Sequence, residues 1–428
     1  MTEQNAAQQS ESLRGRLIRG ATGSFGLNVV SAGLLFGIGV VLARVLGAAG
    51  FGVYSYALSW VGLLAIPVVM GFDRLLVTSD AVVLVASGGI GLGFVAVTWF
   101  ASSTRDPVVF YLAALLLPLQ AIMRLRQSTL AGLERVVAGQ VPEMVIRPVL
   151  FLASVLVLNF VLAESLDVRR IMALNVAAMV VALGSSLFQR HRALPIAVRS
   201  ARHEFHVRAW AAAALPMLVI GGMQILHSQT DVIMLGLMSV SDEEIGIYSV
   251  VVRGTRLILL VMLAVNASIG PVVARMYAQN DLVRLQLLAT RSARGMFAAS
   301  LPLGLGLIAF GPWFLLIFGQ PFVAGQEAMT ILSVGKLMNA LAGTGAIILM
   351  MTGREKDVAI WVALSALLNI AMNWVLIPLY GIEGAAIATA SCEILMSFAV
   401  AWALYRRLEI HATAFGPMSF RGERGGSA

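Results

Sequence analysis

Two strongly apolar stretches within residues 216–271 carry ionisable side chains in their middle. Each stretch is long enough to cross a bilayer as a helix, which takes about 20 residues. Side chains three, four or seven residues apart share one helix face, so Gln224, His227 and Asp231 form a single polar stripe. A charge inside a bilayer costs about 3 kcal/mol on insertion scales. The stripe therefore predicts the wall of a polar pathway; the alternative is that Asp231 pairs with a neighbouring arginine and fixes helix register.

Other apolar stretches carry further buried charges. Arg253 and Arg256 share a face of the second stretch, and Lys336 has no acidic partner in its own helix. Glu143 and Arg147, four residues apart, either pair with each other or face a pathway. Cations outnumber acids at membrane depth, which predicts a cavity for an anion, since the arginine fork donates two hydrogen bonds to a phosphate. Polar side chains also share helix faces in other spans: Asn28, Asn369, Asn373, Thr389 and Glu393.

The composition identifies a polytopic membrane protein. The 428 residues are 59% hydrophobic and 12% charged, with a mean hydropathy of +0.88, whereas a soluble protein carries about 25% charge. The single cysteine, Cys392, excludes an intrachain disulfide and a cysteine-based zinc site. Residues 1–15 are polar and no cleavage site follows, so we expect the first apolar stretch to remain as an anchor.

An all-α fold with about twelve transmembrane helices is predicted, in two six-helix lobes. A short motif recurs at equivalent places, at residues 51–55 and 245–249, and indicates lobes related by a pseudo-two-fold axis along the membrane normal. The predicted regions are a cytoplasmic segment (1–19), an N-lobe (20–189), a basic linker (190–210), a C-lobe (211–405) and a cytoplasmic tail (406–428). The predicted spans are 20–43, 53–72, 81–101, 108–123, 141–161, 170–189, 211–238, 247–270, 296–318, 328–351, 358–378 and 384–405.

The distribution of positive charge sets the expected orientation. With the N-terminus inside, 22 of the 30 Lys and Arg residues fall in inside segments, and only four fall outside. This positive-inside pattern predicts that both termini are cytoplasmic, and it accounts for the net charge of +8 without a nucleic-acid partner. The linker contains His203 and His206 but no cysteine or carboxylate cluster, so we expect no metal site there.

Several segments resemble the polysaccharide transporter flippases. This family belongs to the multidrug/oligosaccharidyl-lipid/polysaccharide exporter superfamily, together with lipid II flippases and multidrug and toxic compound extrusion transporters. The similarity covers nearly the whole chain, and its most specific part is LNIAMNWVLIPLYGIEGAAIAT at residues 368–389. The other matching segments are residues 42–54, 130–135, 231–236 and 246–248.

The resemblance implies a flippase with no enzymatic activity and no cofactor. Its passenger would be an oligosaccharide on polyprenyl pyrophosphate (an O-antigen, capsule or exopolysaccharide repeat unit), moved from the inner to the outer leaflet by alternating access. The expected location is the bacterial inner membrane, where polysaccharide polymerase machinery would be a neighbour. The implied passenger cavity contains Arg147, Arg253, Arg256 and Lys336, with Gln224, His227 and Asn28.

The resemblance also implies a site for a coupling ion. Related lipid II flippases hold sodium with an Asp on span 7, an Asn and an Asp four residues apart on span 11, and a Thr on span 12. The matching positions here are Asp231, Asn369, Asn373 and Thr389. Because Asn373 replaces the second Asp, one negative charge is missing. The coupling ion is therefore either Na⁺ at these positions or a proton on Asp231 or Glu393.

Three other functions fit the sequence less well. A multidrug antiporter carries mostly organic cations, whereas the predicted cavity is cationic; it is the leading alternative within the same superfamily. A membrane glycosyltransferase or polysaccharide polymerase needs acidic residues on substantial outer loops, and the predicted outer loops are short. A non-transporting assembly subunit has no need of charges in so many spans.

Overall fold

The computed structural model of the chain describes residues 3–69, 91, 106–133, 135–162, 165–193, 222–223 and 225–417. In these ranges the regular structure is helical, and the chain is an all-α multi-span membrane protein. Seven described helices are long and apolar enough to cross a membrane, and one bent helix pair gives an eighth candidate. Almost all of predicted span 3, the first part of span 7, most of the linker and Gln224 lie outside the described residues.

The chain divides into two compact units, each built from segments that are separate in the sequence. Unit 1 contains Met1–Leu46 and Ala57–Leu218, and unit 2 contains Gly47–Tyr56 and Val219–Ala428. A short part of the first long helix therefore packs with the C-terminal half of the chain. The lobe boundaries predicted from the sequence stay a prediction.

Unit 1 is a set of long helices whose starts follow local sequence rules. Asp106 caps the second of them, because its Oδ1 accepts a hydrogen bond from the N–H of Val108 at 3.1 Å. Pro107 occupies the first turn, where a backbone N–H would have no helical partner. Pro142 begins a π-helical turn, η1, as expected where a proline removes a backbone donor. The helices are α1 (Glu3–Val69), α3 (Pro107–Gly132), α4 (Val136–Val141), η1 (Pro142–Ile146), α5 (Arg147–Leu156), η2 (Val157–Val161) and α6 (Val168–Ala193).

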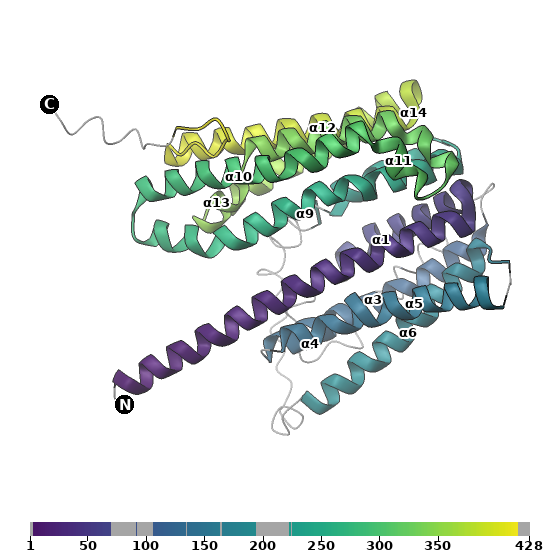
Figure 1. Cartoon of the computed structure of the whole chain (residues 1–428), viewed down its shortest axis with the longest axis horizontal. Coiled ribbons are helices and arrows are strands. Elements are labelled where there is room, and N and C mark those ends of the chain that lie inside the picture. Colours follow the sequence, from purple (N-terminus) through teal and green to yellow (C-terminus); the bar gives the residue numbers. More distant parts are fainter. Residues whose placement is uncertain are drawn as a thin grey trace. The chain divides into compact units, whose positions relative to one another are not determined.

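Unit 2 is a bundle in which α9, α10 and α12 lie side by side and α14 packs on α12 (Figure 1). Helix α9 begins with a capping box, in which Ser241 Oγ accepts from the N–H of Glu244 and the Glu244 carboxylate accepts from the N–H of Ser241. Residues 225–237 are also helical. The further elements are α9 (Asp242–Ala278), α10 (Leu282–Ala309), α11 (Gly311–Leu316), η3 (Gln320–Gly325), α12 (Gln326–Ala342), α13 (Gly345–Met351) and α14 (Glu355–Leu408).

Two of the long helices each contain a pair of predicted spans joined at a single glycine. Helix α1 breaks at Gly47, where φ is 67°, and α14 breaks at Gly381, where φ is 58°. Glycine adopts positive φ without the steric cost that a side chain would bring. The connections are therefore shorter than the predicted loops, residues 44–52 and 379–383.

Span 9 was predicted at residues 296–318, but helix α10 begins at Leu282 and ends at Ala309. Its start lies in a basic segment whose hydropathy is too low to indicate a membrane span, and Asp281 caps it by accepting from the N–H of Arg284 at 3.0 Å. The end was also missed: a new short helix, α11, starts just beyond, with Pro312 in its first turn.

The two glycines of the repeated motif contact each other's helices within unit 2. A Cβ atom on Gly52 would lie 1.7 Å from the carbonyl oxygen of Asp242, and one on Gly246 would lie 2.0 Å from that of Ala48. Only glycine permits two backbones to approach so closely. The second part of α1 and the start of α9 are thus in direct contact through their backbones.

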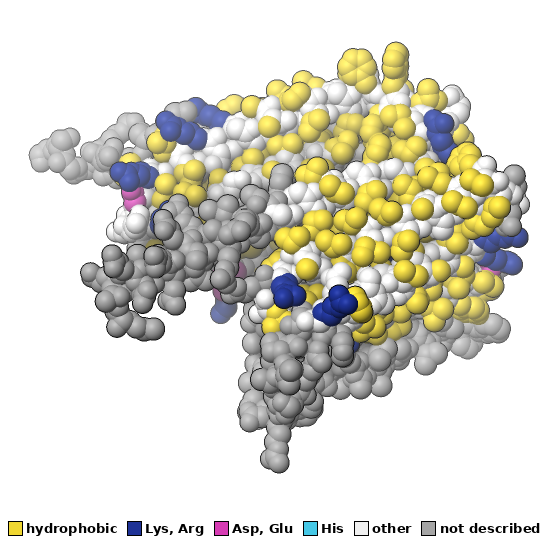
Figure 2. Space-filling view, turned by 60° about the horizontal axis from the view of Figure 1, so that its bottom comes forward, with side chains coloured by type: hydrophobic (Ala, Val, Ile, Leu, Met, Phe, Trp, Pro, Cys, Tyr) yellow, Lys and Arg dark blue, Asp and Glu magenta, His cyan; other side chains and the backbone are white. Residues whose placement is uncertain are grey.

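The surface of the described helices is apolar over wide areas. Figure 2 shows hydrophobic side chains spread across the face in view, with only scattered Lys and Arg side chains. Trp313 is 76% exposed and Trp374 is 69% exposed. Large exposed apolar side chains at this density are expected of helices that face lipid.

Candidate ion and passenger site

Asp231 is the centre of a buried polar network in unit 2. Its carboxylate is 6% exposed and accepts hydrogen bonds from the hydroxyls of Tyr248 and Thr389, both at 2.6 Å. The side-chain amide of Asn373 donates to it at 2.9 Å, and that of Asn369 donates at 3.4 Å. Four neutral donors therefore stabilise the charged form of one buried acid.

Four helical segments bring these side chains together. Asp231 lies in the helix of residues 225–237, and Tyr248 lies in the second turn of α9. Asn369 and Asn373 lie one turn apart on the first arm of α14, and Thr389 lies on its second arm. The break at Gly381 lets the two arms face each other, so the Asn369 amide also donates to Thr389 Oγ1 at 2.9 Å.

The network contains oxygen atoms of the kind that bind a small hard cation. No cationic side chain of the described residues forms an ion pair with Asp231, so the alternative in which an arginine neutralises it is not seen in this part of the chain. The Oδ1 atom of Asn373 is buried and accepts no hydrogen bond from the residues that the structure describes. A carboxylate, a free amide oxygen and the Thr389 hydroxyl are ligands suited to Na⁺. The described residues contain no cluster of three His, Cys, Asp or Glu side chains for a transition metal.

A second buried cluster is centred on Glu393, which lies one helical turn after Thr389 on α14. Glu393, which is 7% exposed, forms an ion pair with Lys336 of α12, and His227 Nε2 lies 3.9 Å from its Oε1. Sequence analysis assigned Lys336 to the passenger cavity and Glu393 to ion coupling, and the structure brings the two together. The opposite charges of Lys336 and Glu393 neutralise each other. In the described part of unit 2, Asp231 is therefore the buried acid that forms no ion pair with a cationic side chain.

Arg253 and Arg256 lie on one face of α9. The Arg253 guanidinium stacks over the Phe51 ring, 4.8 Å from its centroid. Among the residues that the structure describes, no acid forms an ion pair with either arginine. Two positive charges thus remain on this helix for an anionic partner.

The predicted cavity residues of unit 1 have protein partners. Arg147, at the start of α5, donates from Nη2 to Asn175 Oδ1 of α6 at 3.0 Å. Glu143 forms an ion pair with Arg124 of α3 at 3.5 Å. Asn28 lies exposed on α1. These groups belong to unit 1, while His227, the coupling residues and the other predicted cavity cations that the structure describes belong to unit 2.

Sequence reasoning missed Tyr248 as a member of the Asp231 network. The residue stands in the repeated motif, but its hydroxyl partner lies 17 residues away on another helix. One signal was present: a tyrosine within an apolar span needs a partner for its hydroxyl when it is buried.

Two family models match separate parts of the chain. A model described as polysaccharide biosynthesis protein matches residues 17–84, and a model described as MatE matches residues 216–375. A curated relative, described as probable low-salt glycan biosynthesis flippase Agl15 from Haloferax volcanii, is 26% identical over 406 residues. That alignment covers 90% of this chain and 81% of the relative.

Solved structures share the fold. A multidrug resistance MATE family transporter in an inward-facing conformation matches with a TM-score of 0.71 and 12% identity, over 90% of this chain and 94% of that one. The lipid II flippase MurJ, in an inward closed conformation, matches with a TM-score of 0.65 and 13% identity, over 90% and 87%. The fold is thus a multi-span all-α fold of the MATE and MurJ type.

The two matching models and the curated relative agree on one superfamily. Together they indicate a transporter of the multidrug/oligosaccharidyl-lipid/polysaccharide (MOP) exporter superfamily, as the resemblance in the sequence did. Members of this superfamily are transporters rather than enzymes.

Proposed function

We propose that the protein is a flippase that moves a lipid-linked glycan across the membrane by alternating access between two six-helix lobes of twelve spans in total. The observation that carries the proposal is the pair of arginines on α9, Arg253 and Arg256, which no described acid neutralises. Cations at membrane depth fit a phosphate-linked passenger and disfavour an organic cation. The relative described as a glycan biosynthesis flippase supports this passenger class.

The finer proposal concerns the carrier and the orientation. We infer that the glycan is linked to polyprenyl pyrophosphate and forms an O-antigen, capsule or exopolysaccharide unit. The positive-inside pattern favours cytoplasmic termini in a bacterial inner membrane, although the curated relative is archaeal. Both kinds of cell have a single cytoplasmic membrane in which the same transport step would occur.

Ion coupling is proposed to act through Asp231. Binding of Na⁺ would balance the one buried carboxylate that lacks a described cation, and the Asn373 amide oxygen would become a ligand. A proton on Asp231 is the alternative, because it balances the same charge without needing the amide oxygen. Glu393 is already balanced by Lys336, which makes it the weaker candidate for a coupling role.

The test is deletion of the gene in its host, followed by extraction of lipid-linked intermediates and assignment of their leaflet. A polyprenyl-pyrophosphate glycan retained on the cytoplasmic leaflet is the expected result. Complementation with Arg253→Ala or Arg256→Ala should restore export poorly, whereas Arg291→Ala, an exposed α10 arginine outside the network, should restore it fully. Full export by both α9 variants would contradict the passenger assignment.

The multidrug antiporter is the second candidate, because the MatE model matches residues 216–375 and a MATE transporter shares the fold. It predicts that the deletion strain becomes more sensitive to cationic drugs while glycan export continues. That outcome would replace the flippase proposal.

A further inference from the structure

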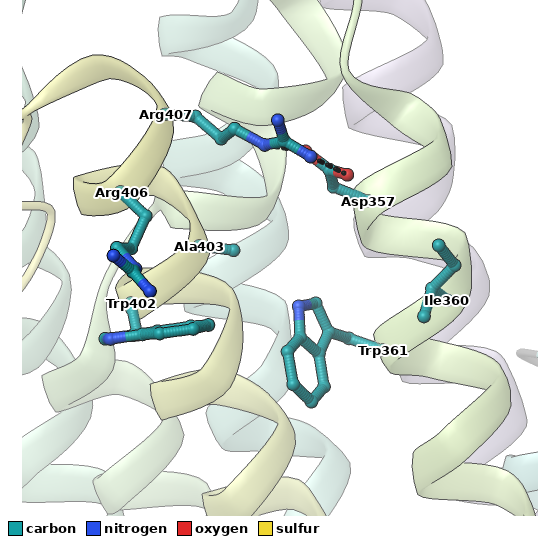
Figure 3. A pocket seen from close by; sticks show the side chains of 7 residues that line it. All are labelled: Asp357, Ile360, Trp361, Trp402, Ala403, Arg406 and Arg407. Carbon is teal, nitrogen blue, oxygen red and sulfur yellow. Dashed lines mark hydrogen bonds and ion pairs between the residues drawn. The ribbon is translucent and has the colours of Figure 1, made fainter.

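Each unit carries a pocket beside the basic end of one of its membrane-spanning helices. In unit 2 a pocket of about 440 Å³ lies between the two arms of α14, and Figure 3 shows the side chains that line it. In unit 1 a pocket of about 400 Å³ lies where α6 ends beside α3 and α4. Neither pocket contains a residue of the Asp231 network or of the α9 arginines.

Two arginines line the unit 2 pocket, and only one of them pairs with a described acid. Arg407 donates from Nε and Nη2 to the two carboxylate oxygens of Asp357, at 3.1 and 3.3 Å, and so ties the arms of α14 together (Figure 3). Arg406 instead lies over the Trp402 ring, 5.0 Å from its centroid. No acid in the described part of the chain forms an ion pair with Arg406, so the lining keeps a net positive charge. Trp361 lines the opposite side of the pocket, on the other arm (Figure 3).

The unit 1 pocket repeats the same chemistry with different residues. The Arg192 guanidinium lies over the Phe188 ring, 4.3 Å from its centroid, and both belong to the last turns of α6. Arg135 lines the same pocket, and its lining contains no carboxylate. The last predicted span of each half thus has an aromatic residue near its end and an arginine four positions later, just beyond the span. These pairs are Phe188 with Arg192 and Trp402 with Arg406.

The position of these pairs selects the ligand. The predicted spans end at residues 189 and 405, so both arginines lie where a membrane-spanning helix leaves the hydrocarbon region. The rings beneath them face outward, with Phe188 57% and Trp402 54% exposed. Aromatic rings at this depth contact headgroups, and basic pockets between transmembrane helices bind anionic lipid heads.

We propose that each pocket binds the phosphate of an anionic phospholipid from the surrounding bilayer. The arginine that lies over an aromatic ring (Arg406 or Arg192) would bind the phosphate, and that ring would contact the glycerol and the first acyl carbons. The inference is independent of which passenger the protein carries, because it uses neither Arg253 nor Asp231.

Native mass spectrometry of the purified full chain tests the proposal, with added phosphatidylglycerol compared with phosphatidylcholine. The wild type should retain two phosphatidylglycerol molecules more tightly than phosphatidylcholine. Arg406→Gln and Arg192→Gln should each weaken one of these sites about tenfold, the loss expected for a charged hydrogen bond. The double variant should lose both, while Arg291→Gln, a matched exposed arginine that lines neither pocket, should bind as the wild type does.

Three outcomes would overturn the proposal. One is equal retention of the two lipids, and another is wild-type phosphatidylglycerol binding by the double variant. The third is displacement of the phosphatidylglycerol by inorganic pyrophosphate at low concentration, which would assign the pockets to a passenger headgroup. Unchanged melting temperatures of the variants in lipid-free detergent would show that lost binding is not lost folding.

Discussion

Restoring the missing acid of the Asp231 network should make the stability of the protein depend on Na⁺ more strongly than that of the wild type does. In Asn373→Asp, a second carboxylate would stand where the Asn373 amide now lies 2.9 Å from Asp231 Oδ1. Two negative charges about 3 Å apart repel by about 5 kcal/mol at an effective dielectric constant of about 20. Such a repulsion is comparable with the whole stability of many proteins, so the folded variant must take up a cation or a proton.

The assay is thermal unfolding in detergent, in NaCl against choline chloride, at pH 8 and at pH 5. We expect NaCl at pH 8 to raise the melting temperature of Asn373→Asp by about 5 °C or more, and much less at pH 5, where a proton serves instead. Asn373→Leu, which loses the amide without gaining a charge, should show no such response. If Asn373→Asp unfolds at the same temperature in both salts at pH 8, the geometry assigned to the network is wrong.

Other changes test separate contacts by thermal unfolding in detergent. Tyr248→Phe removes one hydrogen bond to the buried carboxylate and should cost about 2 kcal/mol, with a smaller loss refuting that bond. Lys336→Met leaves the buried Glu393 without its lysine partner and should cost about 4 kcal/mol. The double variant Lys336→Met/Glu393→Met should recover most of this loss, and no recovery would argue against the pair. Gly246→Ala places a methyl group 2.0 Å from the Ala48 carbonyl oxygen and should destabilise by more than about 2 kcal/mol. A melting temperature equal to that of the wild type would show that the two backbones are not in contact.

Helix faces could be predicted from the sequence, but contacts between helices could not. The spacing of Asn369 and Asn373 placed both on one face, and the structure has them on one face of α14 beside Asp231. Lys336 and Glu393 lie on different helices and are 57 residues apart in the sequence. Periodicity within one helix carries no information about such a pairing.

Hydropathy located apolar stretches better than helix ends. It detects the segment that lipid surrounds, so it missed the polar first turns of α10, which a cap at Asp281 begins. It also could not show that Gly47 or Gly381 alone makes a turn, because backbone dihedral angles leave no trace in a hydropathy profile.

The contact between Gly52 and Gly246 also bears on conformational entropy. Packed side chains lose rotamer freedom each time an interface forms, by up to about 2 kcal/mol for a long one, whereas glycine has no rotamers to lose. At these two glycines, the second part of α1 and the start of α9 therefore pack against each other without that entropy cost. In a transporter that cycles between conformations, such a joint would return to the same register on every turnover, because its shape is set by the main chain alone.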